Sequence, residues 1–260
     1  MSTYKLDCRV DMPYDNTFRQ LWKDCGYPTD LGSCATGRPP DRERLRLFHL
    51  SSTEHAVSNI VRSRLKVARF SDLNDPFELM ALNFQYGQVR RLVREFRTGF
   101  DATTGLLCFS EDWTSPVMWS HYAARHRGIC LGFDVLRSSI EKVQYEEKRL
   151  LPELGESDEP FGLTDELRTM LRHTKCHEWA YEREWRTFVP LANAMQDGEL
   201  YFRAFGDDIH LSEVIVGADC ERKVEEVRQI TAQYHPEARV YKARLAFKHF
   251  KVVPHESTVP

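Results

Sequence analysis

Short apolar runs of strand length recur along the 260-residue chain, and helical patterns lie between them at irregular intervals. The first run, LRLFHLSS at Leu45–Ser52, precedes TEHAVSNIVRSR, whose apolar residues have helical spacing. Other strand-like runs are GLLCFSED, ICLGFD, YEREWRTFVPL, EVIVG, ARVYKARLAF and FKVVP. Because helices and strands do not alternate regularly, this pattern predicts an α+β fold with a mixed, mostly antiparallel central sheet and interspersed helices.

Turn-forming residues mark the predicted domain boundary. Residues 1–44 contain many of them, including GYPTDLGSCATGRPPDRE, and are predicted to form a loosely structured N-terminal extension. Residues 45–260 are then predicted to form a single α+β, catalytic-like domain with a charged insertion near 146–175. A chain of this length buries enough surface to fold without disulfides or metals.

Composition and missing motifs narrow the function classes. The seven cysteines are scattered without a CxxC pair, which argues against a disulfide framework and a zinc ribbon. His173 and His177 have the i, i+4 spacing of two metal ligands but no third ligand nearby, so we expect no metal site. We also expect no membrane-spanning segment and a cytoplasmic location, because apolar runs of signal or membrane length are absent. The net charge of −3 gives no general signal for binding polyanions. Rossmann, P-loop, zincin and α/β-hydrolase motifs are absent as well.

Polar side chains at strand ends are the first candidates for a binding site. His49 ends the first predicted strand, and Ser51 follows it at the start of a helix. Backbone N–H groups at a helix start bind anions, and an imidazole donates to a hydroxyl or a phosphate. Ser110 ends the strand LLCFSE. An ordinary strand-end histidine and a helix-capping serine explain these positions equally well.

Carboxylates on two later strands are candidates for catalysis. In YEREWR, Glu182, Glu184 and Arg186 alternate, so they are predicted to share one face of a strand. Glu184 either neutralises Arg186 or acts on a substrate, where a carboxylate bonds a ribose hydroxyl or stabilises an oxocarbenium ion. Glu213, which precedes a buried apolar run, offers the same alternatives.

The stretch MWSHYAARHRGICLGFD is predicted to be a helix followed by a strand. The helix covers residues 115–126, and Gly128 ends it. We expect Tyr122 to form part of a pocket wall. The basic cluster Arg125–Arg127 is either a solvated helix end or a binding site for an anion.

The chain resembles a bacterial family of unknown function, DUF2971. The segments that carry the resemblance are LFHLSS, NDPFE, LLCFSED, MWSHYAARHRGICLGFD, WAYEREWR and VIVG, in order across Leu45–Gly217. Membership in this family implies no particular function.

A weaker resemblance goes further. The segment LFHLSSTEHAVSNIVRSRLKVA is similar to the opening strand–helix–strand of NAD-using ADP-ribosyltransferases. The resemblance implies that His49 and Ser51 hold the NAD ribose or phosphate and that Tyr122 or Ser110 faces the nicotinamide. It also implies that the Arg125 cluster holds the pyrophosphate or an acceptor nucleic acid.

The same resemblance implies that a glutamate beside a late strand assists the transfer. Glu213 lies where the His-type enzymes carry theirs, whereas Glu182 and Glu184 match the Glu-x-Glu pair of the Arg-type enzymes. Both assignments stay open at this point.

The expected function is therefore that of an NAD-dependent ADP-ribosyltransferase or NAD-cleaving enzyme, as a toxin, effector or phage-defence component. Its partners would be NAD and a protein or nucleic-acid acceptor. One alternative is a nucleic-acid-processing or nucleic-acid-binding protein that uses the basic cluster with Trp119 and Tyr122. The other is a non-catalytic regulatory domain, in which Glu184 and Arg186 form a structural ion pair.

Overall fold

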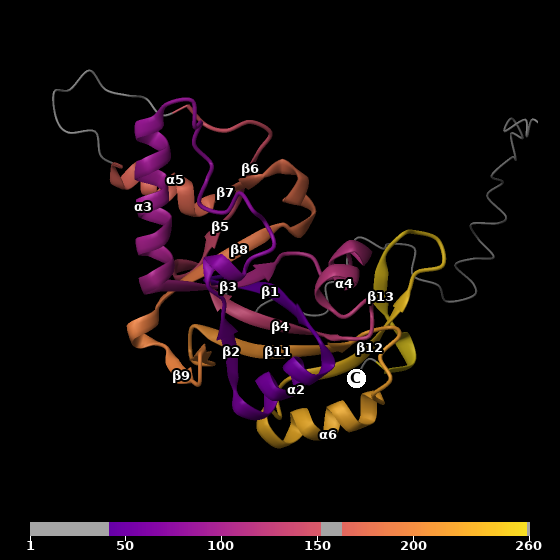
Figure 1. Ribbon diagram of the computed structural model, residues 1–260. Coiled ribbons are helices and arrows are strands. Elements are labelled where there is room, and N and C mark those ends of the chain that lie inside the picture. The colour runs from indigo at the N-terminus through magenta and orange to yellow at the C-terminus, as the bar shows by residue number, and fades with distance from the viewer. Residues whose placement is uncertain (1–41, 152–162, 259–260) are drawn as a thin grey trace, which may run out of the picture. The chain divides into compact units, whose positions relative to one another are not determined.

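The computed structural model describes residues 42–151 and 163–258 (Figure 1). Most of the predicted N-terminal extension and part of the charged insertion lie outside these ranges. The described residues form one large sheet, with helices packed against both of its faces.

The large sheet has eight strands in the order β13-β12-β11-β4-β1-β3-β8-β5. Its strands are β1 (Arg44–Ser51), β3 (Thr104–Ser110), β4 (Ile129–Leu136), β5 (Glu141–Lys142), β8 (Glu184–Pro190), β11 (Ile209–Val216), β12 (Arg239–Leu245) and β13 (Val252–Pro254). Neighbouring strands are antiparallel except β11 and β12, which are parallel. The predicted mixed, mostly antiparallel sheet is confirmed.

Two small sheets and five α-helices surround this central sheet in the described ranges. The small sheets contain β2 (Arg64–Val67), β10 (Leu200–Ala204) and β9 (Met195–Asp197) in one, and β6 (Gln144–Glu146) and β7 (Thr174–Cys176) in the other. The α-helices are α2 (Thr53–Arg62), α3 (Gly87–Thr103), α4 (Pro116–Tyr122), α5 (Asp165–His173) and α6 (Val224–Tyr234). The short 3-10 helices are η2 (Phe70–Asp72), η3 (Arg137–Ser139), η4 (His177–Glu182), η5 (Leu191–Asn193) and η6 (Glu256–Thr258). The α+β class therefore holds throughout the described chain.

The two faces of the central sheet are covered by different helices. Leu47 of β1 belongs to a core cluster that contains Ile60 of α2 and Val227 of α6. The next residue, Phe48, belongs to a second cluster with Trp119 of α4, because successive strand side chains point to opposite faces. We call these the α2–α6 face and the α4 face. Helix α3 also lies on the α4 face, where its aromatic residues pack against β3 and β8.

Helix α4 is shorter than predicted. Ser115 caps its start and Pro116 occupies its first turn, but the helix ends at Tyr122 instead of continuing to residue 126. Residues 124–126 have φ angles of 47°, 56° and 68°. Side-chain-bearing residues adopt this left-handed conformation at a cost of about 1–2 kcal/mol each, so surrounding contacts must hold the turn.

The turn after α4 is held by close backbone packing. A Cβ atom on Gly128 would lie 2.1 Å from the carbonyl oxygen of Ser51, and one on Gly217 would lie 2.3 Å from that of His126. The backbone N–H groups of Gly217 and Asp219 donate to the carbonyls of Gly128 and His126. Only glycine fits at residues 128 and 217 without displacing this backbone.

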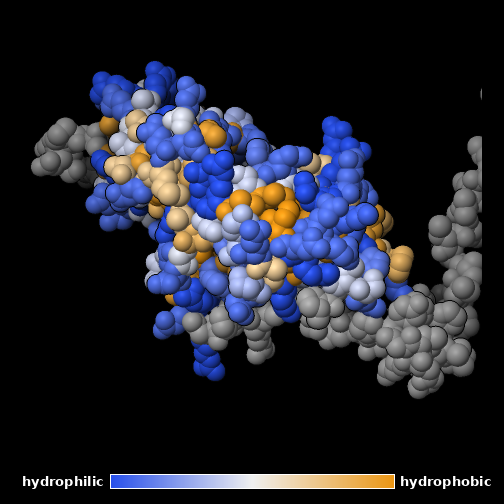
Figure 2. All heavy atoms as spheres, turned by 90° about the horizontal axis from the view of Figure 1, so that it is seen from below, coloured by the Kyte–Doolittle hydropathy of each residue, from blue (hydrophilic) through white to orange (hydrophobic). Residues whose placement is uncertain are grey.

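The surface beneath α2 and α6 is mostly hydrophilic around a central hydrophobic area (Figure 2). Within the described ranges, no helix combines the length and apolar character that crossing a membrane requires.

Candidate functional site

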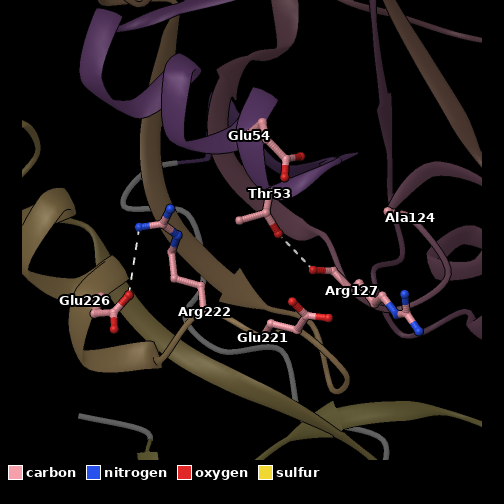
Figure 3. A pocket seen from close by; sticks show the side chains of 7 residues that line it. All are labelled: Thr53, Glu54, Ala124, Arg127, Glu221, Arg222 and Glu226. Atoms are coloured by element: carbon pink, nitrogen blue, oxygen red, sulfur yellow. Dashed lines mark hydrogen bonds and ion pairs between the residues drawn. The ribbon is translucent and has the colours of Figure 1, made fainter.

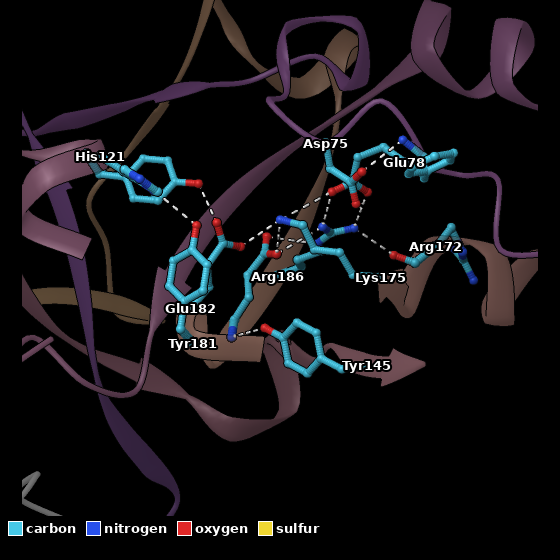
Figure 4. A network of polar contacts seen from close by, with 12 residues as sticks. Asp75, Glu78, His121, Tyr145, Arg172, Lys175, Tyr181, Glu182 and Arg186 are labelled. Atoms are coloured by element: carbon cyan, nitrogen blue, oxygen red, sulfur yellow. Dashed lines mark hydrogen bonds and ion pairs between the residues drawn. The ribbon is translucent and has the colours of Figure 1, made fainter. Parts of the chain in front are cut away.

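Segments that lie far apart in the sequence meet in a buried network of charged side chains on the α4 face (Figure 4). Glu78 comes from NDPFE, Tyr122 from α4 and Lys175 from β7. Glu182 and Arg186 come from the end of η4 and from β8. With Glu184, these residues form a continuous set of ion pairs and hydrogen bonds, which we call the acidic network.

The inner half of the acidic network is centred on Arg186, whose side chain is fully buried. Its guanidinium donates to both oxygens of Glu78 at 2.9 and 2.6 Å and to both oxygens of Glu184 at 2.9 and 3.0 Å. Burial alone would raise the pKa of Glu184, but the positive charges of Arg186 and Lys175 outweigh it and lower the pKa to about 2. Glu184 is therefore a fixed anion.

The outer half of the acidic network is centred on Glu182. Lys175 Nζ lies 2.6 Å from Glu182, 3.2 Å from Glu184 and 3.6 Å from Glu78. The hydroxyl of Tyr122 donates a short hydrogen bond to the other oxygen of Glu182. Burial raises the pKa of Glu182, and the nearby Lys175 and Tyr122 only partly oppose this. Glu182 thus differs from Glu184, whose pKa is lowered.

Aromatic side chains connect the outer half with solvent. Exposed His121 bonds the hydroxyl of half-buried Tyr181 through Nδ1 at 3.0 Å, and Tyr122 is also half-buried. The ring of Trp179 lies 4.9 Å from Lys175 Nζ. Flat rings beside a carboxylate provide a surface on which a planar group can stack.

Local backbone geometry brings these side chains together. Arg183 has a left-handed φ of 46°, which ends η4 and starts β8 directly after it. The predicted alternating strand across YEREWR is therefore wrong at its start, although Glu182, Glu184 and Arg186 all join the acidic network. Asp75 forms a turn by accepting from the Phe77 N–H, and this turn positions Glu78.

Glu213 lies in a separate buried network. Its carboxylate accepts hydrogen bonds from Arg46 at 2.6 Å, from Arg239 at 2.5 Å and from the hydroxyl of Tyr241 at 3.1 Å. Arg46 also binds Asp134 at 2.6 Å. Glu213 is fully buried and saturated with these donors, which is typical of a structural carboxylate.

Glu184 and Glu213 point to the same face but lie far apart. They occupy one row across five adjacent strands, with Ser110, Phe48 and Gly132 between them. Four strand spacings correspond to about 19 Å. The two predicted carboxylates therefore do not form one site.

The predicted cofactor residues are divided between the two faces of the sheet, because Ser110 lies beside Glu184 on the α4 face and His49 and Ser51 do not. His49 points to the α2–α6 face, where Nδ1 lies 3.0 Å from the carbonyl oxygen of Cys108 and the ring contacts Phe109. Burial lowers the pKa of His49. Ser51 lies on the same face, and the side chain that caps α2 is that of Ser52. The hydroxyl of Ser110 is buried and bonds the backbone of Asp112.

A cavity of about 510 Å³ lies beside the turn after α4 (Figure 3). Of the predicted basic cluster, Arg127 lines it, whereas exposed Arg125 does not. The complete lining is Thr53, Glu54, Ala124, Arg127, Glu221, Arg222 and Glu226. Three carboxylates against two guanidiniums do not favour a pyrophosphate. Trp119 is fully buried, so it is not available to contact a nucleic acid.

Sequence reasoning missed part of the acidic network. Lys175 lies within the charged stretch that is predicted to be an insertion, and Tyr145 lies directly before it. The hydroxyl of Tyr145 accepts a hydrogen bond from the Glu184 N–H at 2.8 Å. Glu78 had a signal, because NDPFE was among the segments that carried the family resemblance. Among the residues that the structure describes, no group of His, Cys, Asp and Glu side chains is arranged to hold a metal ion.

Comparisons with known proteins bear on the same region. Residues 118–187 match the model of DUF2971, a family of proteins of unknown function, which confirms the resemblance drawn from the sequence over this part of the chain. The match covers α4 from Met118 onward and every member of the acidic network except Glu78. No curated protein and no solved structure matches the chain.

Proposed function

We propose that this protein, in which residues 118–187 match the DUF2971 model, is an NAD-dependent ADP-ribosyltransferase or NAD-cleaving enzyme, with Glu182 as the reacting carboxylate. The observation that carries the proposal is the opposite direction of the pKa shifts of Glu182 and Glu184 within the acidic network. Glu184 is held as a fixed anion, whereas burial raises the pKa of Glu182 at the end that exposed His121 and half-buried Tyr181 connect with solvent. Perturbed carboxylates beside an accessible surface are typical of catalytic sites.

The chemistry fits a carboxylate in this position. When the bond between ribose and nicotinamide breaks, both electrons go to the nicotinamide nitrogen, and positive charge develops on the ribose. The Glu182 carboxylate would stabilise that charge and then accept the proton of the attacking hydroxyl. Water as the acceptor gives NAD cleavage, and a protein or nucleic-acid hydroxyl gives ADP-ribosyl transfer.

The neighbours of Glu182 have supporting roles in this proposal. Tyr122 and Lys175 each hold one carboxylate oxygen, which fixes the orientation of the group. The rings of His121 and Tyr181 offer a stacking surface for the nicotinamide or the adenine. Glu184 acts as a positioning residue through Lys175, which it shares with Glu182.

The test is an assay with NAD labelled in its ADP-ribose half. Purified protein is incubated with lysate, DNA or RNA, and both nicotinamide release and label transfer are followed. We expect Glu182→Gln to lower turnover roughly 100-fold or more, as loss of an acid–base group does. Glu213→Gln and His49→Ala serve as controls, and every variant is checked for folding by circular dichroism.

The pH profile adds a second readout. If the ionised carboxylate acts, turnover falls as the pH drops through the pKa of Glu182, which lies above its ordinary value of 4.5. Full activity of folded Glu182→Gln, or the absence of both NAD binding and turnover in the wild type, would contradict the proposal.

A further inference from the structure

Helix α3 carries arginines along one side. Arg90, Arg94 and Arg97 follow the spacing i, i+4, i+7, so they lie on one face. The next position on that face is Asp101, which binds Arg69 at 2.9 Å. We call the guanidiniums of Arg69, Arg90, Arg94 and Arg97 together the arginine stripe. From residue 90 to residue 101 the stripe extends over about 16 Å at 1.5 Å per residue.

The positive charge of the arginine stripe is only partly neutralised. Arg90 donates to backbone carbonyl oxygens, and Nη1 of Arg97 donates to the sulfur of Met80 at 3.1 Å. For Arg94, no hydrogen bond or ion pair exists with any residue in the described ranges. Asp101, the one carboxylate on this face, is already bonded to Arg69 and to the N–H of Ser71.

A cavity of about 430 Å³ lies at the C-terminal half of the stripe. Its lining consists of Arg69, Ser71, Arg94, Arg97, Thr98, Asp101 and Ala102. Nε of Arg69 is buried there without a hydrogen-bond partner among the described residues. Guanidiniums bind phosphate oxygens in bidentate geometry, and the two hydroxyls add further donors.

We propose that the arginine stripe binds the sugar–phosphate backbone of a nucleic acid. A line of charges about 16 Å long suits a polymeric anion better than a single phosphate, because it spans about five phosphates of one strand at 3.4 Å each. The cavity lining contains no aromatic side chain, so the contact is to backbone phosphates and does not depend on the base sequence.

This surface is independent of the proposed NAD chemistry. None of the four arginines belongs to the acidic network, and the binding assay contains no NAD. Its location also differs from that predicted for nucleic-acid contacts, the basic cluster Arg125–Arg127 with Trp119.

The experiment measures fluorescence anisotropy of labelled DNA and RNA oligonucleotides, single-stranded and duplex, with the full chain over a range of salt concentrations of roughly 50–200 mM. The stripe variant is Arg94→Gln/Arg97→Gln. The control variant, Arg91→Gln/Arg222→Gln, removes the same charge at exposed arginines that pair with Glu95 and Glu226. Urea unfolding of both variants checks that they are folded.

We expect the stripe variant to bind roughly tenfold more weakly at about 100 mM salt. The slope of log K against log salt should become shallower by about 0.7–0.9 for each lost arginine, while the control binds within about twofold of the wild type. No wild-type binding at about 50 mM salt, or equal weakening in stripe and control variants, would overturn the proposal. Binding to phosphatidylserine vesicles instead of nucleic acid would overturn it as well.

Discussion

Replacing Arg186 by methionine should be among the most damaging single substitutions in this protein. The guanidinium is fully buried and makes paired hydrogen bonds to Glu78 and Glu184, with a further bond to the carbonyl oxygen of Arg172. Methionine is apolar and flexible, and it leaves both carboxylates without their main counter-charge. Breaking one side of a buried ion pair in this way costs about 3–5 kcal/mol.

The pKa of Glu184 gives a second route to the same magnitude. A carboxyl whose pKa falls from 4.5 in the unfolded chain to about 2 in the fold stabilises the folded state by about 3 kcal/mol at neutral pH. Because the folded-state pKa is lowered, this contribution is fully present above pH 4.5 and is lost as the pH falls towards 2. The difference in unfolding free energy between wild type and Arg186→Met should therefore shrink as the pH falls from 4.5 towards 2.

Urea denaturation followed by tryptophan fluorescence measures these free energies. Arg183→Met is the control, since Arg183 is exposed and its distance to Asp112 is 3.8 Å. It should change the free energy of unfolding by less than about 0.5 kcal/mol. Adding Glu184→Gln to Arg186→Met should recover part of the loss, because the stranded charge disappears. A loss of less than about 1 kcal/mol of unfolding free energy in Arg186→Met would refute the reasoning. So would a double variant whose loss equals the sum of the losses of the two single variants.

Two further predictions concern backbone packing and the half-buried His49. Gly128→Ala should destabilise the fold by about 3 kcal/mol or more, because its Cβ would lie 2.1 Å from the Ser51 carbonyl oxygen. The control Gly99→Ala, at an open position in a helix, should stabilise the fold by about 0.5–1 kcal/mol. Thermal unfolding measures both changes, and equal shifts in the melting temperature of the two variants would contradict this prediction. Burial lowers the pKa of His49, so the unfolded chain binds the proton more readily and stability falls as the pH drops below 6.5. His49→Leu should flatten the fall in unfolding free energy between about pH 6.5 and 5, and an unchanged slope would contradict that assignment.

The sheet could be predicted from the sequence, but the turn after α4 could not. Short apolar runs separated by turns report strands directly, because each strand carries its own pattern. By contrast, Ala124 and Arg125 are residues that favour helices, so nothing local indicates their left-handed conformation. The turn is held by backbone hydrogen bonds from Gly217 and Asp219, which lie about 90 residues later in the chain. No local sequence pattern reports a constraint that arrives from so far along the chain.

The predicted grouping of His49 with Glu213 failed for a reason that sequence periodicity hides. Simple alternation along β11 would place Glu213 on the same face as Leu211, which packs on the α2–α6 face where His49 also lies. A register shift between Leu211 and Glu213 inserts one residue and turns Glu213 to the α4 face. A β-bulge therefore reverses the face of every later residue in the strand. Glu182 and Glu184 still meet despite the irregular start of β8, because both bind the same lysine.

The composition of the acidic network argues that its outer end serves more than stability. Glu78, Glu182 and Glu184 face only two cations of the described chain, Lys175 and Arg186. Well-packed apolar residues commonly stabilise a core as much as buried ion pairs do, so stability alone does not account for the network. Arg186 is committed to Glu78 and Glu184, and the neutral hydroxyl of Tyr122 takes the place of a further cation beside Glu182. The carboxylate with the least compensated charge is thus the one nearest half-buried Tyr122 and Tyr181, where gaining or losing a proton disturbs the rest of the network least.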